Sequence, residues 1–160
     1  MDSHSTKPPA GIMITPMHAD HLDDLADLES LAFSIPWSYD ALAEELQNPL
    51  AVFYVAEDVE AESAVGYVGM HHILDEGFIT SVVVHPAYRR KGVATALLEE
   101  LKEYGEEHDL TRIALEVRAS NVAAIALYES LGFNEATIRR NYYPTAEGRE
   151  DAIIMALPIG

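Results

Sequence analysis

Hydrophobic positions along the chain follow two different periods, which predicts a fold that mixes helices and strands. Apolar residues recur at the three- and four-residue spacing of an amphipathic helix in residues 18–33, 39–47, 92–108 and 121–131. Short apolar runs rich in β-branched residues, which favour strands, occupy residues 12–14, 51–57, 65–71, 78–85, 112–118, 133–139 and 152–157. The order β-α-α-β-β-β-α-β-α-β-β predicts an α/β domain with a mixed sheet. In the first helix, Leu22, Leu25 and Leu28 belong to the apolar stripe, and Glu29 lies outside it.

Length and composition fit one domain. The 160 residues are enough to bury a substantial core, and we expect residues 12–160 to form it after a polar, Pro-rich, flexible tail at residues 1–11. Cys is absent, which excludes thiol catalysis, disulfides and thiolate metal sites. No apolar run reaches the roughly 20 residues that span a bilayer, and the N-terminus lacks a signal-peptide pattern. We therefore expect a soluble, cytoplasmic protein.

The net charge of −17 is unevenly distributed. Residues 1–88 hold 15 acidic side chains and one basic side chain, whereas residues 89–160 hold 12 acidic and 9 basic ones. Nucleic acids and anionic membranes need clustered Lys and Arg, so we expect neither as a main partner. The acidic excess favours a cationic partner, or serves only to keep the surface solvated.

The first cluster of positive charge is Arg89-Arg90-Lys91, directly before Gly92. It follows the predicted strand at 78–85 and opens the predicted helix at 92–108. Free N–H groups and the positive end of the helix dipole converge at such a position, which suits a phosphate or pyrophosphate. Gly92 would let the backbone approach that ligand. The segment matches neither a Walker loop nor a dinucleotide fingerprint, and the plain alternative is a solvated basic patch.

Several motifs together carry a resemblance to a known family. Arg89-Arg90-Lys91-Gly92-Val93-Ala94 resembles the Arg/Gln-x-x-Gly-x-Gly/Ala acetyl-coenzyme A (acetyl-CoA) loop of the GNAT superfamily of N-acetyltransferases. Residues 33–38, 116–121, 126–133 and 140–144 resemble the ribosomal-protein-alanine (RimI) type within that superfamily. The resemblance covers roughly residues 12–160. It implies a single-domain GNAT fold with helices on both faces of the sheet.

The resemblance implies acetyl-CoA as cosubstrate and assigns its binding residues. The backbone of Val82, Val83 and Val84 would hold the pantetheine arm, and Asn121 would bond to the cofactor. The pyrophosphate would lie against Arg89, Arg90, Lys91, Gly92, Val93, Ala94 and Thr95.

Two residues are candidates for proton transfer. Alternation along the strand at 112–118 places Glu116 and Arg118 on one side, where they could form a structural ion pair; the resemblance instead implies that Glu116 is the general base. A protein α-amine has a pKa of about 8 and is partly protonated at pH 7, so its attack needs a base. Tyr128 lies two helical turns after Asn121, on the same helix face. From the pattern alone, Tyr128 could line the core and Asn121 could cap the helix, whereas the resemblance makes Tyr128 the general acid.

The acceptor side is assigned by resemblance only. Residues 33–38 and 141–144 would form two substrate loops at a peptide channel, with Trp37 and Tyr142 contacting the acceptor. The implied acceptor is the basic N-terminal tail of a small-subunit ribosomal protein that begins with Ala, which an acidic domain would attract.

Direct acetyl transfer to the amine is the expected mechanism, because the chain has neither a Cys nucleophile nor a Gly-x-Ser-x-Gly elbow. The seven His residues show no ligand spacing, and we predict no metal site. Two alternatives stay open. One is an enzyme with broader N-terminal, Lys or small-amine specificity, and the other is a non-catalytic sensor of acetyl-CoA.

Overall fold

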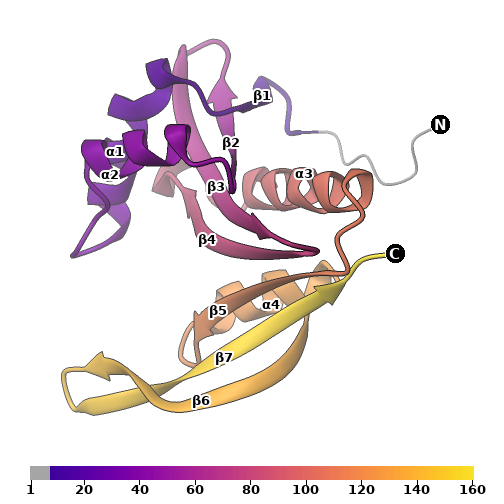
Figure 1. Ribbon diagram of the computed structural model, residues 1–160. Coiled ribbons are helices and arrows are strands. Elements are labelled where there is room, and N and C mark those ends of the chain that lie inside the picture. The colour runs from indigo at the N-terminus through magenta and orange to yellow at the C-terminus, as the bar shows by residue number, and fades with distance from the viewer. Residues whose placement is uncertain (1–7) are drawn as a thin grey trace.

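The computed structural model describes residues 8–160, which form one α/β domain around a seven-stranded sheet (Figure 1). The strands are β1 (Ile12–Pro16), β2 (Ala51–Asp58), β3 (Ser63–Ile73), β4 (Glu76–Val84), β5 (Arg112–Arg118), β6 (Asn134–Thr145) and β7 (Gly148–Pro158). The helices are α1 (Leu22–Ala32), α2 (Tyr39–Gln47), α3 (Val93–Glu107) and α4 (Val122–Ser130), with 3-10 turns η1 (Ala19–His21) and η2 (Pro86–Tyr88). The predicted order of helices and strands is confirmed.

The sheet is mixed, as the sequence predicts. Its strand order is β1-β2-β3-β4-β5-β7-β6, and every neighbouring pair is antiparallel except β4 and β5. Because β4 and β5 are parallel, their connection must cross from one end of the sheet to the other, and α3 makes that crossing. No helix within residues 8–160 is long and apolar enough to cross a membrane.

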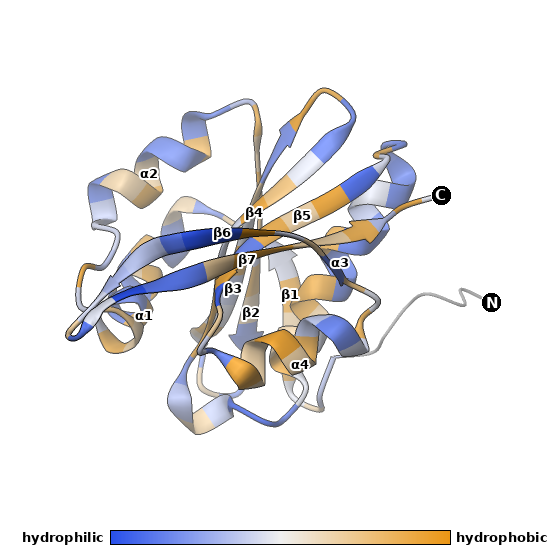
Figure 2. Cartoon of the chain, turned by 90° about the horizontal axis from the view of Figure 1, so that it is seen from below, coloured by the Kyte–Doolittle hydropathy of each residue, from blue (hydrophilic) through white to orange (hydrophobic). Residues whose placement is uncertain are grey.

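Helices cover both faces of the sheet, so two hydrophobic cores form (Figure 2). Successive residues of a strand point to opposite faces. In β2, Val55 accordingly packs into the core beneath α1 and α2, and Ala56 packs into the core beneath α3 and α4. Fully buried members of the first core include Leu25 and Leu42, and Leu97 and Ile113 belong to the second.

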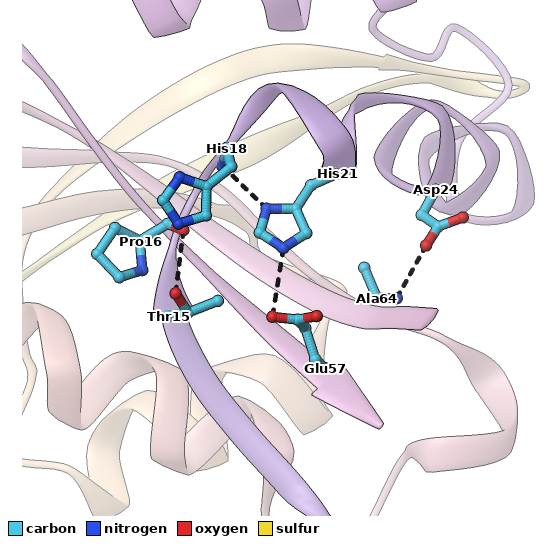
Figure 3. A network of polar contacts seen from close by, with 7 residues as sticks. All are labelled: Thr15, Pro16, His18, His21, Asp24, Glu57 and Ala64. Carbon is cyan, nitrogen blue, oxygen red and sulfur yellow. Dashed lines mark hydrogen bonds and ion pairs between the residues drawn. The ribbon is translucent and has the colours of Figure 1, made fainter. Parts of the chain in front are cut away.

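The predicted helix at 18–33 is shorter than its hydrophobic pattern suggests. The His18 N–H donates to Nδ1 of His21 (2.9 Å), and the intervening residues form a 3-10 turn, so the α-helix begins only at Leu22. Nε2 of His21 lies 3.4 Å from a Glu57 oxygen on β2 (Figure 3). The helix ends at Ala32, and Phe33 is already extended.

Strands β4 and β5 pair over only a short length. Main-chain pairing joins Glu76, Gly77 and Phe78 to the first three residues of β5 and then stops. A register shift between β3 and β4 leaves Thr80 without an opposite partner, and such a bulge bends and twists the strand that carries it. Beyond Phe78 the two strands diverge (Figure 1).

The β6–β7 hairpin corrects one expectation. Residues 141–144, expected as a loop, lie within β6, which continues to Thr145 because a tight turn before Gly148 returns the chain as β7. The pairing is interrupted between Arg139 and Tyr143. There Asn141 has a φ of +55°, and its N–H donates to Asp151 Oδ1 (2.9 Å).

The expected tail at residues 1–11 lies in part outside the described residues. Of its remaining residues, Pro9 and Gly11 accept main-chain hydrogen bonds from Ile12 and Val59, respectively. The boundaries of the tail and the domain stay predictions.

Candidate active site

A cleft of about 420 Å³ lies between the diverging parts of β4 and β5. Its walls come from both strands, α1, the α1–α2 loop at residues 33–38, α4 and β6. The lining residues are Glu29, Phe33, Ile35, Trp37, Ile79, Thr80, Ser81, Val82, Leu115, Glu116, Val117, Arg118, Asn121, Tyr128 and Tyr143. Five residues that the sequence singled out therefore meet in one cavity: Trp37, Val82, Glu116, Asn121 and Tyr128.

Glu116 is held by a different arginine from the one that strand alternation suggests. Its Oε2 lies 3.7 Å from Nη1 of Arg139 on β6, and its Oε1 accepts a hydrogen bond from the Tyr143 hydroxyl (3.3 Å). Arg118 turns away to the Pro144 carbonyl (3.3 Å) and stacks on the Tyr143 ring (4.3 Å to its centroid). The half-buried carboxylate thus keeps a defined orientation while it lines the cleft.

Tyr128 is 8% exposed and packs against the ring of Phe133. Burial raises the pKa of its hydroxyl above the ordinary value of 10. The hydroxyl therefore stays protonated at neutral pH and is a potential proton donor. Tyr128 lines the same cavity as Glu116, so a potential acid and a potential base share one site.

Asn121 caps α4, as its position in the sequence predicts. Its Oδ1 accepts a hydrogen bond from the Ala124 N–H (3.2 Å), which satisfies one free donor of the first turn. The same residue lines the cleft, two turns before Tyr128 on the same helix. Capping and ligand binding are therefore compatible roles for this side chain.

The main chain of residues 82–84 is paired on one side only. Val82, Val83 and Val84 pair with β3, but β5 has already diverged on their other side. Of the three side chains, Val82 lines the cleft and Val83 is buried in the core beneath α1 and α2. Unpaired amides and carbonyls on this edge can bond to an extended ligand.

The basic loop leads from this edge into α3. Gly92 is the residue before the helix and has a φ of +85°, and a Cβ placed there would meet nothing closer than 3.7 Å. The first-turn N–H groups of a helix have no acceptor within it, so the approach to them over Gly92 is open. A pyrophosphate fits this end of α3 in charge and in access.

The loop side chains divide into two groups. Arg89, Arg90 and Lys91 are exposed, and the Arg89 guanidinium bonds to the Val84 carbonyl (3.3 Å). Val93 is buried in the core and can offer only its main chain to a ligand. Ala94 and Thr95 are half-buried in the first turn; none of the residues from 89 to 95 lines the cleft itself.

On the acceptor side, the structure separates the two aromatic residues that the sequence put forward. Trp37 lines the cleft. Tyr142 does not: it is 44% exposed and lies under the Arg139 guanidinium. The interruption of the β6–β7 pairing before Tyr143 turns the neighbouring Tyr143 into the cleft instead.

Arg139 and Glu29 were not among the residues that the motifs assigned to the site, and Tyr143 was included only as part of the expected substrate loop at 141–144, yet all three belong to this site. Glu29 was expected outside the apolar stripe of its helix; it is in fact 2% exposed. A usable signal was present, because Glu29 lies four residues after Leu25 and so shares its helix face. Residues 8–160 contain no group of three or more metal-binding side chains arranged around a common point.

Comparison with known proteins identifies the family of this chain. The model of the acetyltransferase (GNAT) family matches residues 22–133, and the chain belongs to that family. It is 50% identical over 133 residues to the [ribosomal protein bS18]-alanine N-acetyltransferase of Escherichia coli K12, a match that covers 82% of this chain and 87% of that protein. Within the family, the resemblance to the ribosomal-protein-alanine type is therefore confirmed, as is the expected acyltransferase class.

Solved structures support the fold. The crystal structure of the ribosomal-protein-S18-alanine N-acetyltransferase from Escherichia coli superimposes with a TM-score of 0.84 and 44% identity, covering 93% of this chain and 94% of that one. Arabidopsis thaliana NAA60 in complex with acetyl-CoA shares the fold alone, with a TM-score of 0.82 and 20% identity over 92% of this chain and 98% of that one. The predicted GNAT fold is confirmed.

Proposed function

We propose that this protein transfers the acetyl group of acetyl-CoA to the N-terminal α-amino group of a protein, and that its acceptor is the N-terminal Ala of a small-subunit ribosomal protein. The observation that carries the proposal is the cleft between β4 and β5, where Glu116 and Tyr128 meet. The name of the Escherichia coli relative, which is 50% identical, supports the choice of acceptor.

Acetyl-CoA supplies an activated acetyl thioester, and this chain offers it a binding path in two parts. Val82, Val83 and Val84 provide an unpaired main-chain edge for the amide-bearing pantetheine arm. Residues 89–95 and Asn121 complete the path: the loop provides three cations and the open N-terminus of α3 for the pyrophosphate. This assignment accounts for the concentration of positive charge at one point of an acidic chain.

Glu116 acts as general base and Tyr128 as general acid. Glu116 takes a proton from the acceptor amine, which is partly protonated at neutral pH. The freed nitrogen forms a bond to the thioester carbon as the carbon–sulfur bond breaks. Tyr128, whose raised pKa keeps its proton in place, donates that proton to the departing sulfur. The nitrogen of the new amide gives up its second proton, which restores the Tyr128 hydroxyl. No covalent enzyme intermediate is needed.

The acceptor enters past the α1–α2 loop, where Trp37 lines the cleft, and past β6 with its exposed Tyr142. The first 88 residues, with 15 acidic side chains against one basic one, give this half of the chain a strongly negative surface. Such a surface attracts a cationic chain and speeds its encounter with the site. A basic ribosomal-protein tail fits this requirement.

A comparison of two peptides tests the proposed function. We expect CoA release with a basic peptide that begins with Ala, and none when the same peptide has a blocked N-terminus and one internal Lys. Free-thiol titration of CoA measures both. Release from the blocked peptide would instead indicate a Lys acetyltransferase, and tight binding of acetyl-CoA without release from either peptide would indicate a sensor.

Substitution of Gly92 by Ala tests the donor site. A non-glycine residue at a φ of +85° is strained, which should lower the free energy of unfolding by about 1 kcal/mol. The added methyl group also stands where the pyrophosphate approaches, so we expect weaker binding of acetyl-CoA by calorimetric titration. Gly11 is a matched control because its φ is +80° and its surroundings are open. Gly11→Ala should cost similar stability and leave binding unchanged; equal binding losses in both variants would contradict the assignment.

A further inference from the structure

Glu29 is a buried carboxylate to which the proposed chemistry assigns no role. It lies on the inner face of α1, is 2% exposed, and lines the same cleft as Glu116. A charged side chain is stable at such a depth only where donors satisfy its oxygens. The identity of those donors therefore indicates what Glu29 does.

Each carboxylate oxygen of Glu29 accepts one hydrogen bond. The main-chain N–H of Trp37 donates to Oε1 (2.8 Å), and the Tyr67 hydroxyl donates to Oε2 (2.5 Å). Burial, followed by the proximity of Glu29, raises the pKa of Tyr67, so its hydroxyl remains a donor. Ser81, which lines the cleft from β4, lies close enough to the Tyr67 hydroxyl to oppose this rise in the pKa slightly.

These contacts join three parts of the site. Trp37 belongs to the α1–α2 loop, Tyr67 lies on β3, and Ser81 lies on β4. Most of the loop is otherwise exposed: Phe33 is 48% exposed and Ile35 is 89% exposed, although both line the cleft. The bond from the main-chain N–H of Trp37 spans eight residues and ties the far end of the loop to α1, and the Tyr67 hydroxyl ties the same carboxylate to β3.

We propose that Glu29 is a positioning residue that holds the α1–α2 loop against the cleft and thereby sets the affinity for the acceptor, without taking part in the proton transfers. The proposal rests on the proposed function, because it takes this loop as a wall of the acceptor site. Glu29 acts through Trp37 and the loop backbone, and neither of its hydrogen bonds goes to the donor-site residues 82–84 and 89–95.

Two substitutions of Glu29 separate hydrogen bonding from charge. Glu29→Ala removes both acceptors, so we expect the KM for an Ala-initiated basic peptide to rise about tenfold, with the KM for acetyl-CoA unchanged. Glu29→Gln keeps an oxygen for the Trp37 N–H, and its amide can donate to Tyr67, whose hydroxyl can turn to Ser81. Glu29→Gln should therefore retain the acceptor KM. A loss in Glu29→Gln equal to that in Glu29→Ala would overturn the proposal in favour of a charge effect.

Asp24 provides a matched control on the same helix. Its Oδ2 accepts a hydrogen bond from the Ala64 N–H (3.0 Å), so it also ties α1 to β3 through a main-chain amide, but it does not line the cleft (Figure 3). Asp24→Ala should lower the free energy of unfolding and leave both KM values unchanged. If Asp24→Ala raises the acceptor KM as much as Glu29→Ala does, the effect belongs to α1 as a whole and the proposal fails.

Trp37 is the single Trp of the chain, so its fluorescence reports the loop position without any acceptor. In Glu29→Ala we expect a red-shifted emission and stronger acrylamide quenching, with wild-type values in Glu29→Gln and Asp24→Ala. This readout decides whether Glu29 positions the loop even if the wild-type protein acetylates neither peptide, a result that would overturn the proposed function alone. Unchanged fluorescence in Glu29→Ala would overturn the positioning role.

Discussion

Replacing Glu116 by Gln will lower kcat by about 10²–10⁴-fold, the range that a positioned general base contributes. Gln has the shape of Glu and can still accept the hydrogen bond from Tyr143, but it cannot take up the proton of the acceptor amine. CoA release at saturating peptide measures the loss. The deficit should shrink as the pH rises past about 8, because the free amine then exists without help from the enzyme.

A matched variant distinguishes the base from its surroundings. Tyr143→Phe removes the donor to Oε1 of Glu116 but keeps the carboxylate and its ion pair with Arg139. Tyr143→Phe should lower kcat less than Glu116→Gln does. The pH dependence of its kcat should match that of the wild-type enzyme. An unchanged rate and pH profile in Glu116→Gln would remove Glu116 from the role.

Replacing Tyr128 by Phe will lower kcat by about 10²-fold, with little change in the KM for acetyl-CoA. The ring still packs against Phe133, so the lost hydroxyl accounts for the effect. The active form of a general acid is protonated, and its activity falls as the pH rises through its pKa. Since burial raises that pKa above 10, the wild-type enzyme should keep its rate up to pH 10 and lose it above that value, whereas Tyr128→Phe should lack this limb.

The expected loss of kcat above pH 10 must be distinguished from unfolding at high pH. Tyr67 and Tyr128 both have pKa values that the folded state raises above the ordinary value of 10. The unfolded chain ionises first, so the stability that both groups contribute below pH 10 is lost as the pH rises further. Unfolding must therefore be measured at each pH. A wild-type kcat in folded Tyr128→Phe would contradict the assignment.

The hydrophobic periods predicted the order of helices and strands because that order depends on local pattern. The ends of elements depend on contacts from elsewhere in the chain. The first helix starts at Leu22 rather than residue 18 because the His21 side chain takes the His18 N–H and faces Glu57 on β2. Similarly, β6 runs through residues 141–144 because of its pairing with β7.

The residues of the cleft also divide into those that local motifs identified and those that depend on contacts from elsewhere in the chain. Glu116, Asn121, Tyr128, Trp37 and Val82 were named from motifs, and they line one cavity. Their catalytic and binding roles stay predictions.

The partners of these residues could not be predicted. A displaced register in β6 turns Tyr143 inward in place of Tyr142 and brings Arg139, rather than Arg118, to Glu116. The buried carboxylate of Glu29 accepts a hydrogen bond from Tyr67, which is 38 residues away in the sequence.

The early end of the β4–β5 pairing has a consequence for hydration. In a closed sheet, one side of residues 79–84 would bond to β5; here the Val84 carbonyl bonds to Arg89, and the other peptide groups on that side must bond to water. An extended ligand with amides of its own can take over these hydrogen bonds, and the released water gains entropy. The affinity gained in this way comes from the main chain alone. It should therefore survive exchange of Val82 for another β-branched residue.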